Sequence, residues 1–123
     1  MNKSFRIGDV FLINFAGSEH EQTGLRPGVV FQNNTGNIHS PNVIVLPITS
    51  SVRKLADNLP THVTVYSNDS GLIKDSVVLC ENPVIISKNK CGNYLTTLPV
   101  KYMRQIAIAN LLCLLLNLML FQN

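Results

Sequence analysis

The sequence has no tryptophan and few charged residues, and these shortages narrow the class of protein. Charged residues make up 14% of the chain and hydrophobic residues 46%. A chain with so little charge and so many apolar side chains is not an intrinsically disordered or acidic tail protein. Its 123 residues suffice for a core that needs no metal or disulfide to hold it. We therefore predict a single domain over residues 1–123.

Cysteines and carboxylates are also scarce. Cys80, Cys91 and Cys113 are odd in number and have no C-x-x-C spacing, which argues against a disulfide framework or a zinc site and indicates a reducing compartment. The seven Asp and Glu residues form nothing like the carboxylate cluster of a two-metal nuclease. The chain also lacks the glycine patterns of phosphate-binding and dinucleotide-binding loops. We expect no metal and no other cofactor.

Basic residues exceed acidic ones by a small margin. Ten Lys and Arg against seven Asp and Glu give a net charge of +3. This balance permits an anionic partner without requiring one, because a protein dedicated to duplex nucleic acid usually carries a denser basic stripe. The residues before Asp9 contain no apolar segment typical of a secretory signal peptide. We expect a cytoplasmic protein.

The longest apolar run covers residues 106–121 and is interrupted only by Asn110 and Asn117. A membrane-spanning helix needs about 20 apolar residues, and amide side chains are costly at the bilayer centre. The two asparagines fall on nearly the same face of a helix. We predict a helix that is buried on most sides, in the core or against a second subunit. A short membrane anchor is the less favoured alternative.

The first hundred residues have the sequence pattern of short β-strands separated by turns. The predicted strands cover residues 9–15, 29–32, 43–48, 61–66, 76–79 and 84–87. Residues 33–37 and 69–71 are predicted turns, and residues 50–58 a short helix. Pro47 suggests an edge strand or a bulge, and a long helix follows Pro99. This spacing is typical of a mainly β fold, either a small barrel or a strongly curved sheet.

Arg26 stands beside Pro27 at the mouth of a predicted strand, directly after a polar loop. The guanidinium group suits a phosphate, because its planar fork matches two phosphate oxygens and keeps its charge. The simpler alternative is structural. Arg26 would then form an ion pair with Glu19 or Glu21, or lie solvated at the rim.

Thr49, Ser50 and Ser51 place three hydroxyl groups in a row at a predicted strand-to-helix junction. Hydroxyls and backbone N–H groups at such a junction can bind an anion. The same residue types also commonly cap helix N-termini. Both roles are compatible, since one serine can cap the helix while Thr49 faces a ligand.

The histidines His20, His39 and His62 have no metal-ligand spacing with one another or with other ligand residues. His20 lies in the first loop and could carry a proton near neutral pH. We expect all of them at the surface or at a rim.

In its ordered motifs over about residues 6–85, the chain resembles the MazF/PemK family of toxin endoribonucleases. The matching segments are GDVF at 8–11, HEQTGLRPGVV at 20–30, QNN at 32–34, SPNVIV at 40–45, ITS at 48–50, LPTHV at 59–63 and DSVVLCE at 75–81. Each segment is weak alone, and the resemblance rests on their shared order and spacing.

The resemblance implies an SH3-like β-barrel with helices, of the type found in the MazF, PemK and CcdB toxins, with a C-terminal helix and a homodimeric assembly. It implies a sequence-specific endoribonuclease that cuts single-stranded mRNA without a metal, leaving a 2′,3′-cyclic phosphate and a 5′-hydroxyl. It also implies a cognate antitoxin whose flexible, acidic C-terminal segment occupies the RNA groove.

Arg26 and Thr49 match the arginine and threonine that this family uses at its active site. Glu21 is the third candidate catalytic residue, although His20 or the ribose geometry alone could replace it as the base. The implied RNA-binding residues are His20, Gln22, Gln32, Asn33, Ser50, Ser51 and Ser76.

Two alternative functions remain at this point. A toxin of the same fold can poison a topoisomerase by binding it, but such a protein would not need Arg26 and Thr49 together. The other alternative is a non-catalytic module that binds RNA. Incubation with a long single-stranded RNA in EDTA separates these alternatives, because only the nuclease produces fragments.

Overall fold

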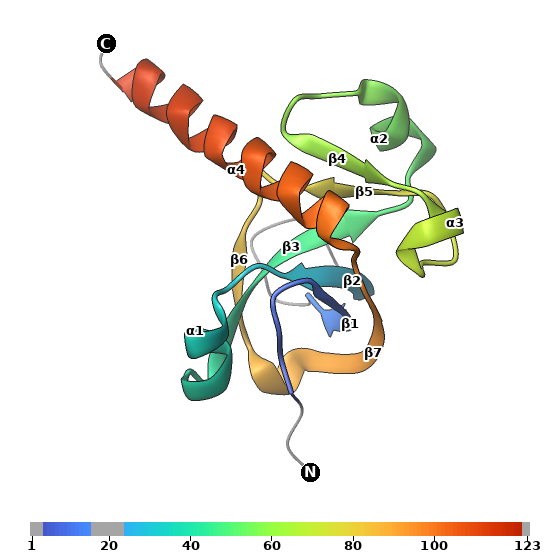
Figure 1. The fold of residues 1–123 in the computed structure, drawn as a ribbon, viewed down its shortest axis with the longest axis vertical. Coiled ribbons are helices and arrows are strands. Elements are labelled where there is room, and N and C mark those ends of the chain that lie inside the picture. Colours follow the sequence, from blue (N-terminus) through green and yellow to red (C-terminus); the bar gives the residue numbers. More distant parts are fainter. Residues whose placement is uncertain (1–3, 16–23, 122–123) are drawn as a thin grey trace.

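The computed structural model describes residues 4–15 and 24–121, in which a β-sheet is covered by a long C-terminal helix (Figure 1). The strands are β1 (Asp9–Asn14), β2 (Leu25–Val30), β3 (Asn42–Thr49), β4 (His62–Val65), β5 (Ser76–Leu79), β6 (Val84–Ser87) and β7 (Cys91–Thr97). The helices are α1 (Asn34–His39), α2 (Val52–Asp57), α3 (Ser67–Ser70) and α4 (Val100–Phe121), with a 3-10 turn, η1, at Lys88–Lys90.

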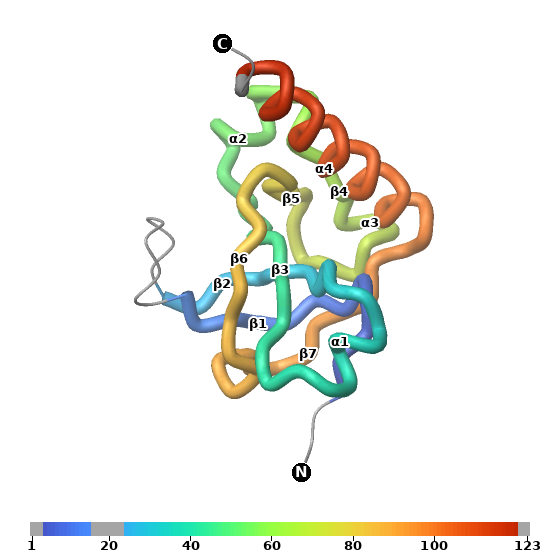
Figure 2. The backbone as a smooth tube through the Cα atoms, turned by 90° about the vertical axis from the view of Figure 1, so that its left-hand side faces the viewer, coloured from blue at the N-terminus to red at the C-terminus, as the bar shows by residue number. Residues whose placement is uncertain are grey.

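The seven described strands pair antiparallel in the order β4-β5-β3-β2-β1-β7, and β6 pairs with β3. The two halves of β3 have different neighbours, because β6 pairs along Asn42–Val45 and β5 at Ile48 and Thr49. In Figure 2, β3 and β6 run across the direction of β1 and β2. The result is a mixed α/β fold with a bent antiparallel sheet. Within the described residues, no pairing joins β4 to β7, so the expected closure into a barrel is not shown.

Most predicted elements are confirmed, but several local assignments are wrong. Residues 33–37 were expected to form a turn, and most of them belong to α1, because the Asn33 side chain accepts a hydrogen bond from the Gly36 N–H at 2.9 Å and caps the helix. The turn expected at 69–71 is the end of α3, which stops at Gly71 with a φ of 84°. Pro47 lies buried in the middle of the sheet rather than at an edge. The prediction missed β7.

The alternation of side chains along β3 divides the core into two clusters. Val43 and Val45 pack with Phe11 on one face, whereas Leu46 and Ile48 belong to the cluster beneath α4. Successive side chains of a strand point to opposite faces. A strand that is apolar on both faces is therefore the natural centre of this fold.

The helix α4 packs onto the sheet through its first half only. Tyr102, Ile106 and Ala109 are buried in the core, and the Asn110 side chain donates to the Cys80 carbonyl at 3.1 Å. By contrast, every residue from 114 to 120 is exposed, and α4 extends away from the sheet (Figure 1). Within one chain, the second half of α4 is therefore exposed, and the expectation of a helix buried on most sides is wrong for that half.

By length and composition, α4 could cross a membrane, with a mean hydropathy of 1.7 in the segment Val100–Leu120. The buried side chains of its first half belong to the core of the domain, however, and spanning a bilayer would require pulling them out. Such a removal would cost the hydrophobic free energy of their burial.

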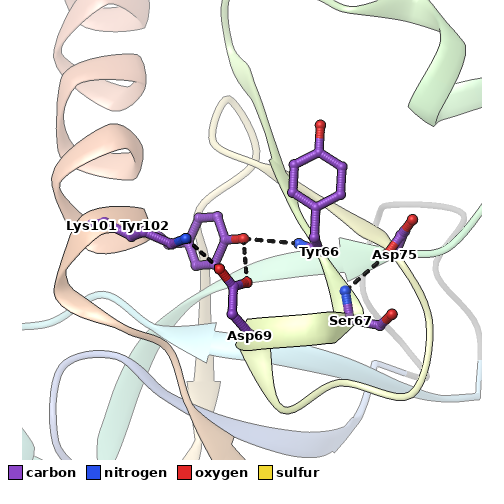
Figure 3. Close-up of polar contacts among 6 residues, drawn as sticks. All are labelled: Tyr66, Ser67, Asp69, Asp75, Lys101 and Tyr102. Atoms are coloured by element: carbon purple, nitrogen blue, oxygen red, sulfur yellow. Dashed lines mark hydrogen bonds and ion pairs between the residues drawn. The ribbon is translucent and has the colours of Figure 1, made fainter.

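Polar contacts fix the first turn of α4 to α3 (Figure 3). The Tyr102 hydroxyl accepts from the Tyr66 N–H at 3.1 Å and donates to Asp69 at 2.6 Å. Lys101 forms an ion pair with the same carboxylate. The hydrogen bonds from Lys101 and Tyr102 hold the pKa of Asp69 below its usual value, whereas burial raises the pKa of Tyr102. Tyr102 thus joins the hydrophobic core to a polar network.

Replacing Tyr102 with phenylalanine should destabilise the fold by about 1–2 kcal/mol, because it leaves the Tyr66 N–H without its acceptor. Urea denaturation measures the change. The matched control is Tyr66→Phe, whose ring is 53% exposed, and we expect it to change stability by less than about 0.5 kcal/mol. Equal unfolding midpoints for the two variants would contradict the proposed role of the hydroxyl.

Candidate active site

The pairing of β2 with β3 brings the two main candidate residues together. Gly28 is matched with Pro47, and Val29 with Leu46. Extending this register by two residues places Arg26 opposite Thr49. Because Pro27 and Pro47 have no N–H to donate, they limit further pairing of these strands. The strands end as neighbours without a continuous ladder, which leaves room between them for a ligand.

A pocket of about 500 Å³ opens at this point. Its lining residues come from β2, β3 and the segment that leads into β5: Leu25, Arg26, Pro27, Ile48, Thr49, Ser50, Ile73, Lys74 and Ser76. No carboxylate is among these described lining residues. Arg26 is exposed while Thr49 is only 9% exposed, so the pocket combines a solvent-accessible cation with a hydroxyl held by the sheet.

Backbone interactions position the hydroxyl groups in the pocket. Thr49 Oγ1 accepts from the Ser51 N–H at 3.2 Å, and a hydroxyl that accepts still has a proton to donate. Ser51 occupies the N-cap position of α2 but makes no capping hydrogen bond through its side chain. The β3–β5 register pairs Thr49 with Val77, so its extension places Ser50 beside Ser76. Arg26, Thr49, Ser50 and Ser76 therefore share one pocket.

The other candidate residues lie elsewhere. Gln32 and Asn33 follow the far end of β2, where Gln32 Oε1 accepts from the Ile44 N–H at 3.1 Å and Asn33 caps α1. The strand from Arg26 to the end of β2 at Val30 alone spans about 13 Å, and neither Gln32 nor Asn33 lines the pocket. His20, Glu21 and Gln22 lie outside the described residues, as does Glu19.

His62 is half-buried as a residue and its side chain is enclosed, whereas we expected it at the surface or at a rim. Its side chain is 3% exposed, and its Nε2 lies 2.8 Å from Glu81 Oε2. This contact joins the start of β4 to the residues after β5 and does not line the pocket. His39 is exposed, as expected. Within 4–15 and 24–121, no three His, Cys, Asp or Glu side chains gather as metal ligands.

None of the described cysteines is placed to act as a nucleophile in the pocket. Cys80 and Cys91 are buried, and Cys113 is partly exposed on α4. Burial raises the pKa of the Cys80 thiol to about 12, with a further contribution from Glu81, so the thiol stays protonated at neutral pH. The charged and polar side chains that line the pocket therefore carry guanidinium, ammonium and hydroxyl groups.

Five lining residues were not among the predicted site residues: Leu25, Pro27, Ile48, Ile73 and Lys74. Ile73 is 96% exposed, and Lys74 is also exposed. The signal for Ile73 and Lys74 is non-local, because the segment before β5 reaches Arg26 only through the pairing of β5 with β3 and of β3 with β2. No local motif around Lys74 marks it as part of a site.

The motif order and the fold agree with comparisons to known proteins. The family model described as "PemK-like, MazF-like toxin of type II toxin-antitoxin system" matches residues 6–114. The chain belongs to this toxin family. Endoribonuclease MazF from Staphylococcus saprophyticus is a homologue, 41% identical over 102 residues that cover 82% of this chain and 83% of the relative.

Solved structures of family members share the fold. MazF from Deinococcus radiodurans superposes with a TM-score of 0.73 at 21% identity, covering 89% of this chain and 94% of the other. A mycobacterial endoribonuclease, solved in complex with its cognate antitoxin, gives a TM-score of 0.73 at 23% identity, covering 89% and 93%. At identities this low, the structural similarity establishes the fold of this chain alone.

The position of Asn33 at the N-cap of α1 gives a prediction about stability. Asn33→Ala removes the acceptor for the Gly36 N–H and should cost about 1 kcal/mol, whereas Asn33→Asp keeps an acceptor and should retain most of the stability. Urea denaturation of both variants measures the difference. If Asn33→Ala unfolds at the wild-type midpoint, the cap contributes nothing to folding.

Proposed function

We propose that this family member is a sequence-specific endoribonuclease that cuts single-stranded mRNA in the cytoplasm and is neutralised by a cognate antitoxin. The observation that supports it most directly is the shared pocket of Arg26 and Thr49. The homologue from S. saprophyticus is named as an endoribonuclease, and a mycobacterial relative is seen with its antitoxin. We also propose that two copies of the chain form a homodimer.

The proposed reaction needs no metal. The ribose 2′-oxygen attacks the adjacent phosphorus, the bond from phosphorus to the 5′-oxygen breaks, and a 2′,3′-cyclic phosphate and a 5′-hydroxyl result. Arg26 stabilises the charge that develops on the phosphoryl oxygens, a contribution that is usually the largest single one in such reactions. The Thr49 hydroxyl holds the same phosphate by donating its proton.

Two proton transfers complete the chemistry. A base takes the proton of the 2′-hydroxyl, and the leaving 5′-oxygen gains a proton, for which Arg26 is our candidate donor. Glu21 is our candidate for the base, with His20 as the alternative. Arg26 is a poor base, since an arginine side chain loses its proton only above a pH of about 12.

The proposed RNA contacts divide into two groups. Ser50 lies in the pocket beside Thr49, where its hydroxyl can donate to the backbone of the RNA. The Ser76 hydroxyl already donates to the Lys74 carbonyl, so it can only accept, for example from a ribose hydroxyl. The side-chain oxygens of Gln32 and Asn33 already accept backbone hydrogen bonds, but their amide N–H groups can still donate to base edges. The contacts of His20, Gln22 and Ser51 with RNA stay predictions.

The acidic antitoxin segment that we propose as partner suits the same pocket. Arg26 and Lys74 line it, and no carboxylate does among the described residues. Carboxylates of the antitoxin can then replace RNA phosphates on the same cations. The rival reading, a topoisomerase poison that acts by binding protein, leaves the juxtaposition of Arg26 and Thr49 without a role.

Substitutions at Arg26 and Thr49 test the proposed chemistry. Arg26→Ala should slow cleavage by about a hundredfold or more, a loss of about 3 kcal/mol of transition-state stabilisation. Arg26→Lys should rescue little, because an ammonium group cannot reproduce the two-pronged contact. Thr49→Ala should also cripple cleavage, and Thr49→Ser should keep part of the activity because it keeps the donor.

The measurement is single-turnover cleavage of one long single-stranded RNA in EDTA, with circular dichroism as the folding control. Near-wild-type cleavage by folded Arg26→Ala would refute the site. Wild-type cleavage that appears only after magnesium or manganese is added would refute the metal-free reaction. RNA that binds but stays intact in both conditions would favour the non-catalytic binding module.

The second half of α4 allows a test of the proposed homodimer, because Leu114 and Leu118 are exposed on one face of this helix. A second copy would cover such apolar surface. We expect a dimer by light scattering at micromolar concentration, weakened by Leu118→Glu and unaffected by Ile38→Glu, which alters an exposed residue of α1. A monomeric wild-type chain that floats with lipid vesicles would instead support the membrane anchor.

A further inference from the structure

Lys74 is the second cation that lines the pocket, and it comes from a different segment than Arg26. It precedes β5, whereas Arg26 belongs to β2. Its neighbour Asp75 does not line the pocket, and the Asp75 carboxylate accepts from the Ser67 N–H at 2.8 Å (Figure 3). Lys74 therefore lines a pocket to which the described part of the chain contributes no carboxylate.

The backbone that carries Lys74 is held on both sides. The buried Ser76 hydroxyl donates to the Lys74 carbonyl at 2.8 Å. On the other side, Leu72 is buried, and its N–H donates to Ser70 Oγ at 3.1 Å. Such anchoring places the lysine at the pocket before any ligand arrives, which lowers the entropy lost on binding.

The position of Lys74 along the chain separates it from the reacting phosphate. Thr49 pairs with Val77, and Lys74 lies three residues before Val77, beyond the start of β5. In single-stranded RNA, each phosphate has another phosphate on either side along the backbone. A cation displaced along the strand from Thr49 and Arg26 is suited to one of these neighbours.

The chemistry of the two cations fits this division. The guanidinium of Arg26 makes directional, paired hydrogen bonds, which suits a phosphate whose geometry changes during reaction. An ammonium group on a flexible stem acts as a point charge, which suits a phosphate that is only bound. We propose that Lys74 binds the phosphate next to the scissile one and anchors the RNA without taking part in the bond-breaking step. This inference rests on the proposed function.

The test separates binding from cleavage. The binding probe is a mixed-sequence 2′-O-methyl oligoribonucleotide, which lacks the attacking hydroxyl and cannot be cut. Its affinity is measured over a series of salt concentrations for the wild type, Lys74→Gln, Lys74→Arg and Lys90→Gln. The last variant is the matched control, because Lys90 is exposed in η1 and does not line the pocket.

We expect Lys74→Gln to bind the probe about three- to tenfold more weakly at low salt, and to reduce the slope of log affinity against log salt by about 0.7. Lys74→Arg should restore both values, and Lys90→Gln should match the wild type. The cleavage rate of Lys74→Gln at saturating RNA should stay within about threefold of the wild-type rate, because no transition-state contact is lost.

Two results would overturn the inference. One is a Lys74→Gln protein that equals Lys90→Gln in affinity and salt slope. The other is a fall of about a hundredfold in the saturating rate with unchanged affinity, which would place Lys74 on the reacting phosphate. If the wild-type chain binds the probe through Lys74 but does not cut RNA, the Lys74–phosphate contact is supported. Only the proposed nuclease activity is then refuted.

Discussion

The pairing of β2 with β3 is the constraint on which the rest of the site depends. Matching Gly28 with Pro47 sets the register that places Arg26 opposite Thr49, and the separate β3–β5 register then brings Ser76 beside Ser50. Gly28 also permits the close packing, since a Cβ there would lie 2.6 Å from Ile13 Cδ1. A slip of one residue would turn Arg26 and Thr49 to opposite faces of the sheet. The stability of this register is therefore a requirement for function as well as for folding.

The constraint extends to the opposite side of the sheet through β3. Strand β3 lies between β5 and β2, and its Leu46 and Ile48 belong to the core cluster beneath α4. Tyr102 holds α4 against this face through its buried ring and through its bonds to Tyr66 and Asp69. A loss of this anchoring would act on the pocket indirectly, by loosening the strands that carry it.

Local patterns in the sequence predict much of the fold and the centre of the site. Short β-rich runs between turn residues located most strands, and residue chemistry together with the matched motifs pointed to Arg26 and Thr49. What failed depends on contacts between distant residues. The strand β7 is mostly exposed and polar, so its assignment comes from pairing with β1 rather than from its own pattern. Asn33 is typical of a turn by residue type, but in the structure its side chain caps α1.

The same reasoning explains why the sequence predicts Ser76 as a site residue but does not predict Lys74. Ser76 belongs to a matched motif, whereas Lys74 acquires its meaning only from the topology that carries the start of β5 to Arg26. A pocket with cations from two segments and no described carboxylate has a favourable potential for any polyanion. In the proposed function, RNA and an acidic antitoxin segment are both attracted by this charge, and the geometry of Arg26 and Thr49 distinguishes the substrate from the inhibitor. Inhibition by an acidic segment would then be a physical consequence of the charge that the proposed RNA binding requires.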